Sequence, residues 1–238
     1  MSRPYARRVG SRGAYVRRLR PNPHDELRFV RGTLYTPDEV IPLKQIGKGA
    51  FSTAYVEKNP PAGGGARVFV LSADNVYDKE LLAMAHDEAP RNPHLPAVER
   101  FGHTHDRAVF TMPLYKSPLR KDDDPVGWRD YLVLKKCRDD AYAPAYGGAY
   151  KRGRSGYEIN EAVYDCAEAR GVRPSLLEAL RVLIDTAANY GAEYVFEFSP
   201  RNLATYEGRL VLLDVLYDRE ALIRQREAAM KRRVGNVW

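Results

Sequence analysis

Cysteine is scarce in this sequence, and long apolar runs are missing. The only two cysteines, Cys137 and Cys166, do not form a Cys-x-x-Cys pair. We therefore expect neither a disulfide framework nor a zinc site, and a reducing compartment is the default expectation. No apolar stretch approaches the roughly 20 residues that a membrane-spanning helix needs, so the sequence predicts a protein without membrane partners.

Acidic residues are missing from the first 20 positions. Seven of the 38 basic side chains lie there, and the other 31 are balanced by the 31 acidic ones, so the net charge of +7 belongs to this arm. An arginine run repels itself and cannot form a core, which predicts an extension that seeks phosphate, RNA or an acidic surface. The alternative is a solvated tail without a specific partner.

The chain length of 238 residues suits one large domain or two small lobes. Residues 21–40 are interpreted as a linker. The apolar segment 41–56 is interrupted at Gly47 and Gly49, which predicts two strands joined by a glycine turn. Further strands are expected at 67–71, 98–101 and 108–112, with a helix over 74–88. The first half therefore predicts a small antiparallel sheet of five strands and one helix.

The second half has a helical character. A helix is expected around 131–137, followed by a glycine- and tyrosine-rich insertion at 143–157. Apolar residues recur at helical spacing from Pro174 up to Gly191, which predicts a long helix that faces the core. A hairpin over 203–214 should turn at Glu207 and Gly208. The last segment, 219–233, predicts a short basic helix.

The glycine turn could bind phosphate. Glycines at 47 and 49 leave the backbone amides open to close approach by a polyphosphate, and Lys48 lies between them. A dinucleotide-binding loop would open a helix, whereas Phe51 and Tyr55 continue a strand here. The alternative interpretation is an ordinary hairpin turn.

A second group of polar residues follows the long helix. Glu197 precedes Asn202 by five residues, and Asp214 lies at the end of the predicted hairpin. A carboxylate, an amide and a second carboxylate suit the orientation of a hydroxyl and the chelation of Mg²⁺ by oxygen ligands. Alternatively, Asn202 caps a turn and Asp214 ends a strand.

Together these motifs resemble the protein-kinase fold, and most closely the early serine/threonine protein kinases of short-tailed lytic phages, the autographiviruses. Gly-Lys-Gly-Ala-Phe-Ser at 47–52 is similar to the kinase glycine-rich loop, and 197–202 is similar to the catalytic loop D-x-x-x-x-N. The resemblance implies an α+β, two-lobed fold that binds ATP and Mg²⁺. It divides the chain into a basic arm and linker (1–39), a sheet lobe (40–116), a helical lobe (117–218) and a basic C-terminal helix (219–238).

The resemblance also implies a role for each matching residue. Glu197 would orient the acceptor hydroxyl, and Asn202 and Asp214 would act in catalysis by holding Mg²⁺. The nucleotide would be bound by Gly47, Lys48, Gly49, Phe51, Ser52, Val68, Val70, Glu80 and Met112. Among these, Glu80 would lie on the helix that carries the partner of the phosphate-binding lysine.

Three departures from the kinase pattern bear on activity. Val70 stands where the third strand would carry the phosphate-binding lysine, Glu197 replaces the catalytic aspartate, and Asp214 is followed by Val-Leu rather than Phe-Gly. Lys48 could replace the missing lysine; the alternative is that it faces solvent. Active phosphate transfer and a pseudokinase that only binds proteins both remain open.

The resemblance implies a host or viral protein as partner and the cytoplasm of the infected host cell as location, with virion association as an alternative. A second function class follows from the arginine arm, namely a structural protein associated with nucleic acid or the virion. In that case nucleic-acid affinity should fall steeply with salt and on deletion of residues 1–20.

Overall fold

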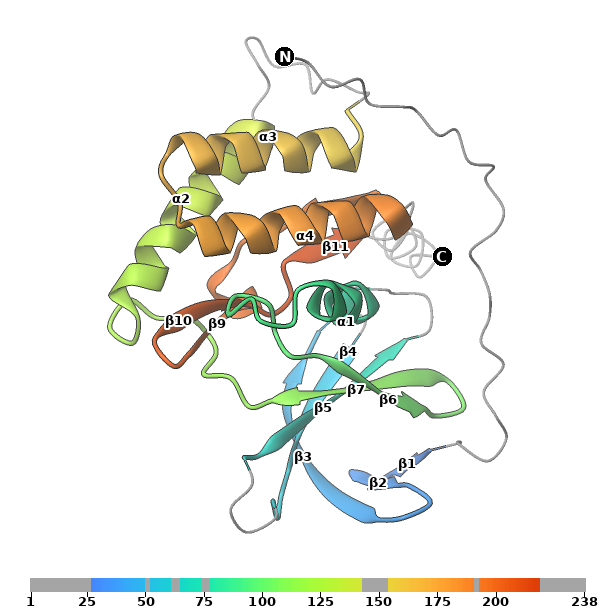
Figure 1. Ribbon diagram of the computed structural model, residues 1–238. Helices are drawn as coiled ribbons and strands as arrows, with labels where there is room; N and C mark the ends of the chain where they lie inside the picture. Colours follow the sequence, from blue (N-terminus) through green and yellow to red (C-terminus); the bar gives the residue numbers. More distant parts are fainter. Residues whose placement is uncertain are drawn as a thin grey trace, which may run out of the picture.

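The computed structural model describes residues 27–49, 52–60, 65–73, 78–142, 154–190 and 193–218. These residues form an α+β fold in which a curled sheet lies at one end and the helices lie at the other (Figure 1). The arginine arm, the segment 219–238 and residues 143–153 of the predicted insertion lie outside the described residues.

The elements are β1 (Arg28–Val30), β2 (Thr33–Tyr35), β3 (Val40–Lys48), β4 (Ser52–Glu57), β5 (Arg67–Ala73), α1 (Asp78–Glu88), β6 (Glu99–His103), β7 (Arg107–Pro113), α2 (Pro125–Tyr142), α3 (Gly156–Ala169), α4 (Pro174–Tyr190), β8 (Tyr194–Phe196), the 3-10 turn η1 (Pro200–Asn202), β9 (Leu203–Tyr206), β10 (Arg209–Leu212) and β11 (Leu216–Asp218).

The main sheet has seven antiparallel strands in the order β1-β2-β3-β4-β5-β7-β6. The expected sheet of five strands is therefore too small. The two additional strands, β1 and β2, lie in the segment that the sequence suggested was a linker. They are only three residues long each and turn at Arg31 and Gly32, which both have positive φ. Such short strands leave little periodicity in the sequence, but Leu34 is fully buried and anchors them.

The sheet curls until its two outermost strands approach each other. The backbone N–H of Leu27, just before β1, donates to the carbonyl oxygen of His103 at the end of β6 (N···O 2.8 Å). The curled sheet encloses its own apolar core, separate from the core of the helical half. This inner core consists of Leu27, Leu34, Ile41, Leu43, Phe69, Leu71 and Val109.

The other face of the sheet packs against the helices. Along β5, Val68 and Val70 alternate with the inner-core residues Phe69 and Leu71, as expected for a strand buried on both faces. Val68 and Val70 share one apolar core with Leu82 of α1. Helix α1 therefore lies between the sheet and the helical half, where it packs on α4 (Figure 1).

The long helix expected from the periodicity is present as α4. Leu176, Leu180 and Leu183 recur on one side of it and are fully buried. Helix α3 was not predicted. It begins at a capping box in which the Ser155 hydroxyl accepts a hydrogen bond from the Glu158 N–H and the Glu158 carboxylate accepts one from the Ser155 N–H. None of the helices in the described ranges is long and apolar enough to cross a membrane.

A disulfide joins Cys137 of α2 to Cys166 of α3. The expectation of no disulfide is therefore wrong. Its basis was the absence of a local cysteine motif, whereas this pair is separated by 29 residues and is brought together by the packing of two helices. Such a pairing cannot be deduced from cysteine spacing.

His94 ties the sheet end of the molecule to the helical end. It lies in the loop 89–98 between α1 and β6, and its buried ring contacts two elements of the helical half. Nδ1 lies 2.6 Å from the Leu210 carbonyl oxygen, which can only accept, so this nitrogen carries the proton. Nε2 lies 3.0 Å from the Ser175 hydroxyl, which then donates. Burial lowers the pKa of His94 below its ordinary value, opposed by the hydrogen bond to Leu210.

We predict that stability falls as the pH drops below the ordinary histidine pKa of about 6.5, because the unfolded chain then binds a proton that folded His94 resists. The contribution is fully present above that pH and declines by at most about 1.4 kcal/mol per pH unit below it. Urea unfolding of the wild type and of His94→Gln between pH 7.5 and 5 measures it. The slope should be smaller in His94→Gln and unchanged in His105→Gln, which alters an exposed histidine; equal slopes in all three proteins would contradict the assignment.

The disulfide should stabilise the fold by restricting the unfolded chain. A bridge across 29 residues is worth roughly 3 to 4 kcal/mol in the chain-entropy model. Denaturant unfolding with and without a reducing agent should show that loss in the wild type and no effect of reductant in the double variant Cys137→Ala, Cys166→Ala. Two titratable thiols in the denatured, unreduced wild type would show that the bond is absent.

Candidate functional site

The segment that contains Glu197 and Asn202 is held between paired strands. The buried strand β8 leads into it, and β8 pairs with β11, which lies just beyond Asp214. The backbone N–H of Glu197 donates to the carbonyl oxygen of Val215 (2.8 Å), which continues this pairing into the loop. The loop ends in the turn η1, and the side chain of Glu197 is exposed.

The β9–β10 hairpin brings Asn202 to Asp214. It turns at Glu207 and Gly208, as predicted, and both residues have positive φ. The resulting register pairs Leu203 with Leu212, so the residues just outside the hairpin meet. The N–H groups of Leu213 and Asp214 both donate to the backbone carbonyl oxygen of Asn202, at 2.9 and 3.1 Å. Three residues predicted from the sequence, Glu197, Asn202 and Asp214, are therefore held on one backbone framework.

Lys79 on α1 also reaches this framework, and sequence reasoning missed it. Its Nζ donates to Oδ1 of Asp214 and to the carbonyl oxygen of Leu213, both at 3.0 Å. The Lys79 side chain is only 6 % exposed, whereas that of Asp214 is 44 % exposed. A buried ammonium group needs oxygen partners to offset its lost hydration, and Asp214 and Leu213 supply them. The contact lies where the interior meets solvent.

Glu80, the predicted partner of a phosphate-binding lysine, pairs with an arginine instead. Its carboxylate accepts a hydrogen bond from Nε of Arg100 on β6 (2.8 Å). The next residue along α1 turns by about 100° around the helix axis, so Lys79 and Glu80 lie on different sides. The helical phase could have revealed this, because the buried residues Leu82 and Ala83 follow Lys79 by three and four positions.

The predicted glycine turn is present between β3 and β4. The N–H of Gly49 donates to the carbonyl oxygen of Ser52 (2.8 Å), and Gly47 pairs with Ala54 just after a bulge in β3. Neither glycine has a positive φ, and a Cβ atom added to either would meet only ordinary contacts of 3.6 Å or longer. The fold therefore does not itself require glycine at either position. Phe51 lies outside the described residues, and the side chain of Lys48 is exposed.

The remaining predicted nucleotide-binding residues form an apolar wall. Val68 and Val70 are buried on the face of β5 that packs toward α1, and Met112 of β7 pairs with Val68 across the sheet. The strand position that carries the phosphate-binding lysine in the kinase pattern is thus occupied by a buried valine, which has no charge. The segment after β7 is fixed to the loop region, because Lys116 forms a bridge with Thr205 and Leu119 N–H donates to the Pro200 carbonyl oxygen (3.0 Å).

No group of three or more His, Cys, Asp or Glu side chains in the described ranges could hold a metal ion. The predicted Mg²⁺ ligands are one carboxylate, Asp214, and one amide, Asn202. This small donor set fits Mg²⁺, which is commonly held by one or two carboxylates together with substrate phosphates and water rather than by a complete protein cage. The amide Nδ2 of Asn202 lies 3.5 Å from the Glu197 carbonyl oxygen, a long contact within the loop.

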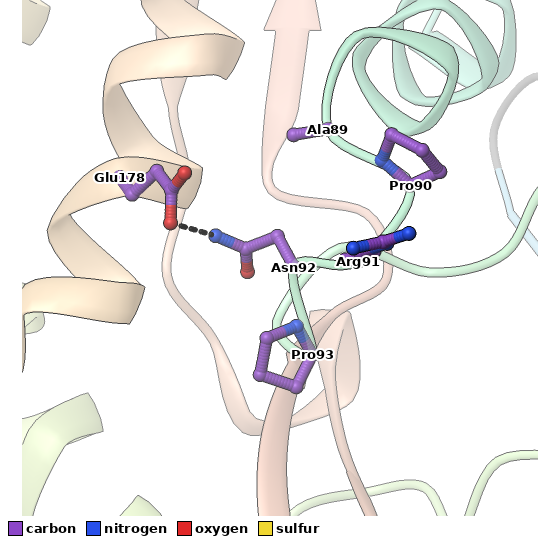
Figure 2. Close-up of a pocket in the computed structure, with 6 residues that line it drawn as sticks. All are labelled: Ala89, Pro90, Arg91, Asn92, Pro93 and Glu178. Atoms are coloured by element: carbon purple, nitrogen blue, oxygen red, sulfur yellow. Dashed lines mark hydrogen bonds between the residues drawn. The ribbon is translucent and has the colours of Figure 1, made fainter.

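An open hollow of about 350 Å³ lies elsewhere, between the loop 89–98 and α4. Figure 2 shows its lining, in which Nδ2 of Asn92 donates to the Glu178 carboxylate (3.2 Å). It is lined by Ala89, Pro90, Arg91, Asn92, Pro93 and Glu178, so it includes none of the predicted site residues. Its interactions connect the loop to α4.

Comparison with models of known protein families gives no match to this chain, and comparison with curated proteins gives none either.

Proposed function

We propose that this chain is a two-lobed, protein-kinase-like protein that binds ATP with Mg²⁺ between its sheet and its helical half. The observation that carries the proposal is the convergence on Asp214. This carboxylate is fixed beside Asn202 by backbone hydrogen bonds and contacts an ammonium group from α1. A carboxylate, an amide and a cation at one partly exposed point suit a metal-bound polyphosphate.

The order of elements supports the same proposal. A strand leads to the Glu197–Asn202 loop, a hairpin follows, and Asp214 precedes a strand that pairs back with the first one. In the kinase pattern the catalytic loop and the metal-binding aspartate are also separated by such a short stretch of chain. The glycines at 47 and 49 add support, because the backbone there does not need them, and their missing side chains leave room for phosphate.

The chemistry available at this site is phosphate transfer to a hydroxyl group. Asp214 and Asn202 would hold Mg²⁺, which neutralises charge on the phosphates when bound. The exposed carboxylate of Glu197 would orient the acceptor hydroxyl and take its proton as the oxygen attacks the terminal phosphorus and ADP departs. Glutamate is one methylene longer than the usual aspartate, and a displacement of about 1 Å can cost about 100-fold in rate. We therefore propose slow transfer at most, with pseudokinase-like binding of proteins as the other outcome.

The resemblance supplies the biological setting of the proposal. It suggests a phage effector that acts on or binds host proteins in the cytoplasm of an infected cell. Association of residues 1–20 with nucleic acid or the virion remains the alternative prediction.

We predict that Mg²⁺ with ATP raises the melting temperature of the full chain, because a ligand that binds only the folded state stabilises it. At 100 times the dissociation constant the gain is about 2.7 kcal/mol, or roughly 5 to 10 °C for a protein of this size. Thermal unfolding with ATP, with and without Mg²⁺, measures it. Asp214→Asn should abolish the Mg²⁺-dependent part of the shift.

Asp139→Asn is the matched control, because it removes the same charge from α2, where the carboxylate pairs with Lys135. It should keep the wild-type shift. Incubation with ATP labelled at the terminal phosphate then separates the two outcomes: label on the chain or on a host lysate that Asp214→Asn abolishes indicates transfer, and nucleotide binding without label indicates a pseudokinase. A wild type that gives no shift at any nucleotide concentration overturns the proposal.

A further inference from the structure

We infer that Lys79 is the phosphate-binding cation of this site, provided from helix α1 instead of from the strand position that Val70 occupies. The inference rests on the proposed function. It assigns to a named residue the positive charge that a polyphosphate site needs and that the third strand of the kinase pattern lacks here.

Helix α1 is in the right place to supply this charge. It packs on β6 of the sheet and on α4, and its residue Leu82, three residues after Lys79, belongs to the same apolar core as Val68 and Val70 of β5. Lys79 precedes Leu82 by one helical turn, so its stem leaves α1 on the side that faces this shared core. The whole Lys79 side chain is buried, and its ammonium group contacts the partly exposed carboxylate of Asp214.

The hydrogen-bond partners of the Lys79 ammonium group support the same assignment. Nζ contacts a carboxylate oxygen of Asp214 and the carbonyl oxygen of Leu213, and both residues donate their N–H groups to Asn202. The cation is thus positioned by the same backbone framework that would place the metal ligands. Asp214 is 44 % exposed and Lys79 only 6 %, so solvent reaches the carboxylate side of the pair. A phosphate bound beside Asp214 would accept from the buried ammonium group at that point.

Lys48, the substitute suggested by the sequence, is placed differently. It lies at the end of β3 on the glycine turn, its backbone is paired with Thr53, and its side chain is exposed. An exposed ammonium group keeps its hydration and is screened by salt, so its attraction for phosphate is weaker than that of a partly desolvated one. The geometry therefore favours Lys79 over Lys48.

The first test compares ATP affinity, with Mg²⁺, across charge variants of the full chain. Lys79→Met keeps the aliphatic stem and removes the charge, and it should weaken binding roughly 10- to 100-fold, the range for loss of a charge-assisted hydrogen bond. Lys79→Arg should restore most of the affinity. Lys48→Met tests the substitute suggested by the sequence and should weaken binding less than Lys79→Met. Lys135→Met is the matched control, because it removes the same charge from the exposed pair with Asp139 on α2, and it should bind within about twofold of the wild type.

The second test uses the wild-type chain and is independent of variant folding. An adenosine derivative that carries a sulfonyl fluoride where the phosphates would lie reacts with a nearby lysine. The ammonium group first loses a proton to solvent, the ε-nitrogen of the resulting amine then forms a bond to sulfur, and fluoride leaves with a second proton. Peptide mapping should find the sulfonamide on Lys79, and excess ATP with Mg²⁺ should prevent it.

The outcomes separate this inference from the proposed function. If the wild type binds ATP with Mg²⁺ but Lys79→Met binds equally well, or if the label is found on Lys48, the inference is overturned while the proposed function stands. If the wild type binds no ATP, the proposed function fails and the inference fails with it.

Discussion

The contact between Lys79 and Asp214 is the interaction on which the geometry of the site depends. It connects a helix that packs on the sheet to a segment that belongs to the helical half. A charged group that is almost fully buried must keep its oxygen partners, because losing them leaves an uncompensated charge in the interior. The position of α1 relative to Asp214 is therefore fixed by electrostatics as well as by apolar packing. The buried ring of His94 makes a second, neutral connection between the two halves.

Much of the fold could be predicted wherever one periodicity extends over several turns or where a turn needs particular residues. The apolar repeat of α4 and the turn at Gly208 are examples. Helix α3 was missed because the glycine- and tyrosine-rich stretch before it obscured the helical periodicity. Ser155 and Glu158 nevertheless have the residue types and the spacing of a capping box. Strands β1 and β2 were missed because three residues are too few for alternation to be visible. Leu34 is the one residue of these two strands that is fully buried, and it lies in the inner core that the curled sheet encloses.

The part of the candidate site that depends on a local turn could be predicted, and the part that depends on long-range packing could not. Asn202 and Asp214 are joined by one short hairpin, so a local turn prediction was enough to bring them together. Lys79 is 135 residues from Asp214, and only the packing of α1 brings it there. The sequence also directed attention to Glu80, because the family pattern places an acid on this helix, whereas the helical phase places the neighbouring lysine on the buried side.

The hydrogen bond between Leu27 and His103 has a consequence for the behaviour of the protein in concentrated solution. Unpaired N–H and C=O groups along a border strand can recruit strands from other molecules and so start aggregation. Here the two edge strands of the sheet, β1 and β6, approach each other, so fewer of their backbone groups are accessible to other molecules. The closure needs a glycine at position 102, where φ is +153° and a Cβ atom would come within 2.9 Å of Leu27. A larger side chain there would strain the backbone next to the contact between the two borders and displace the Leu27 side chain.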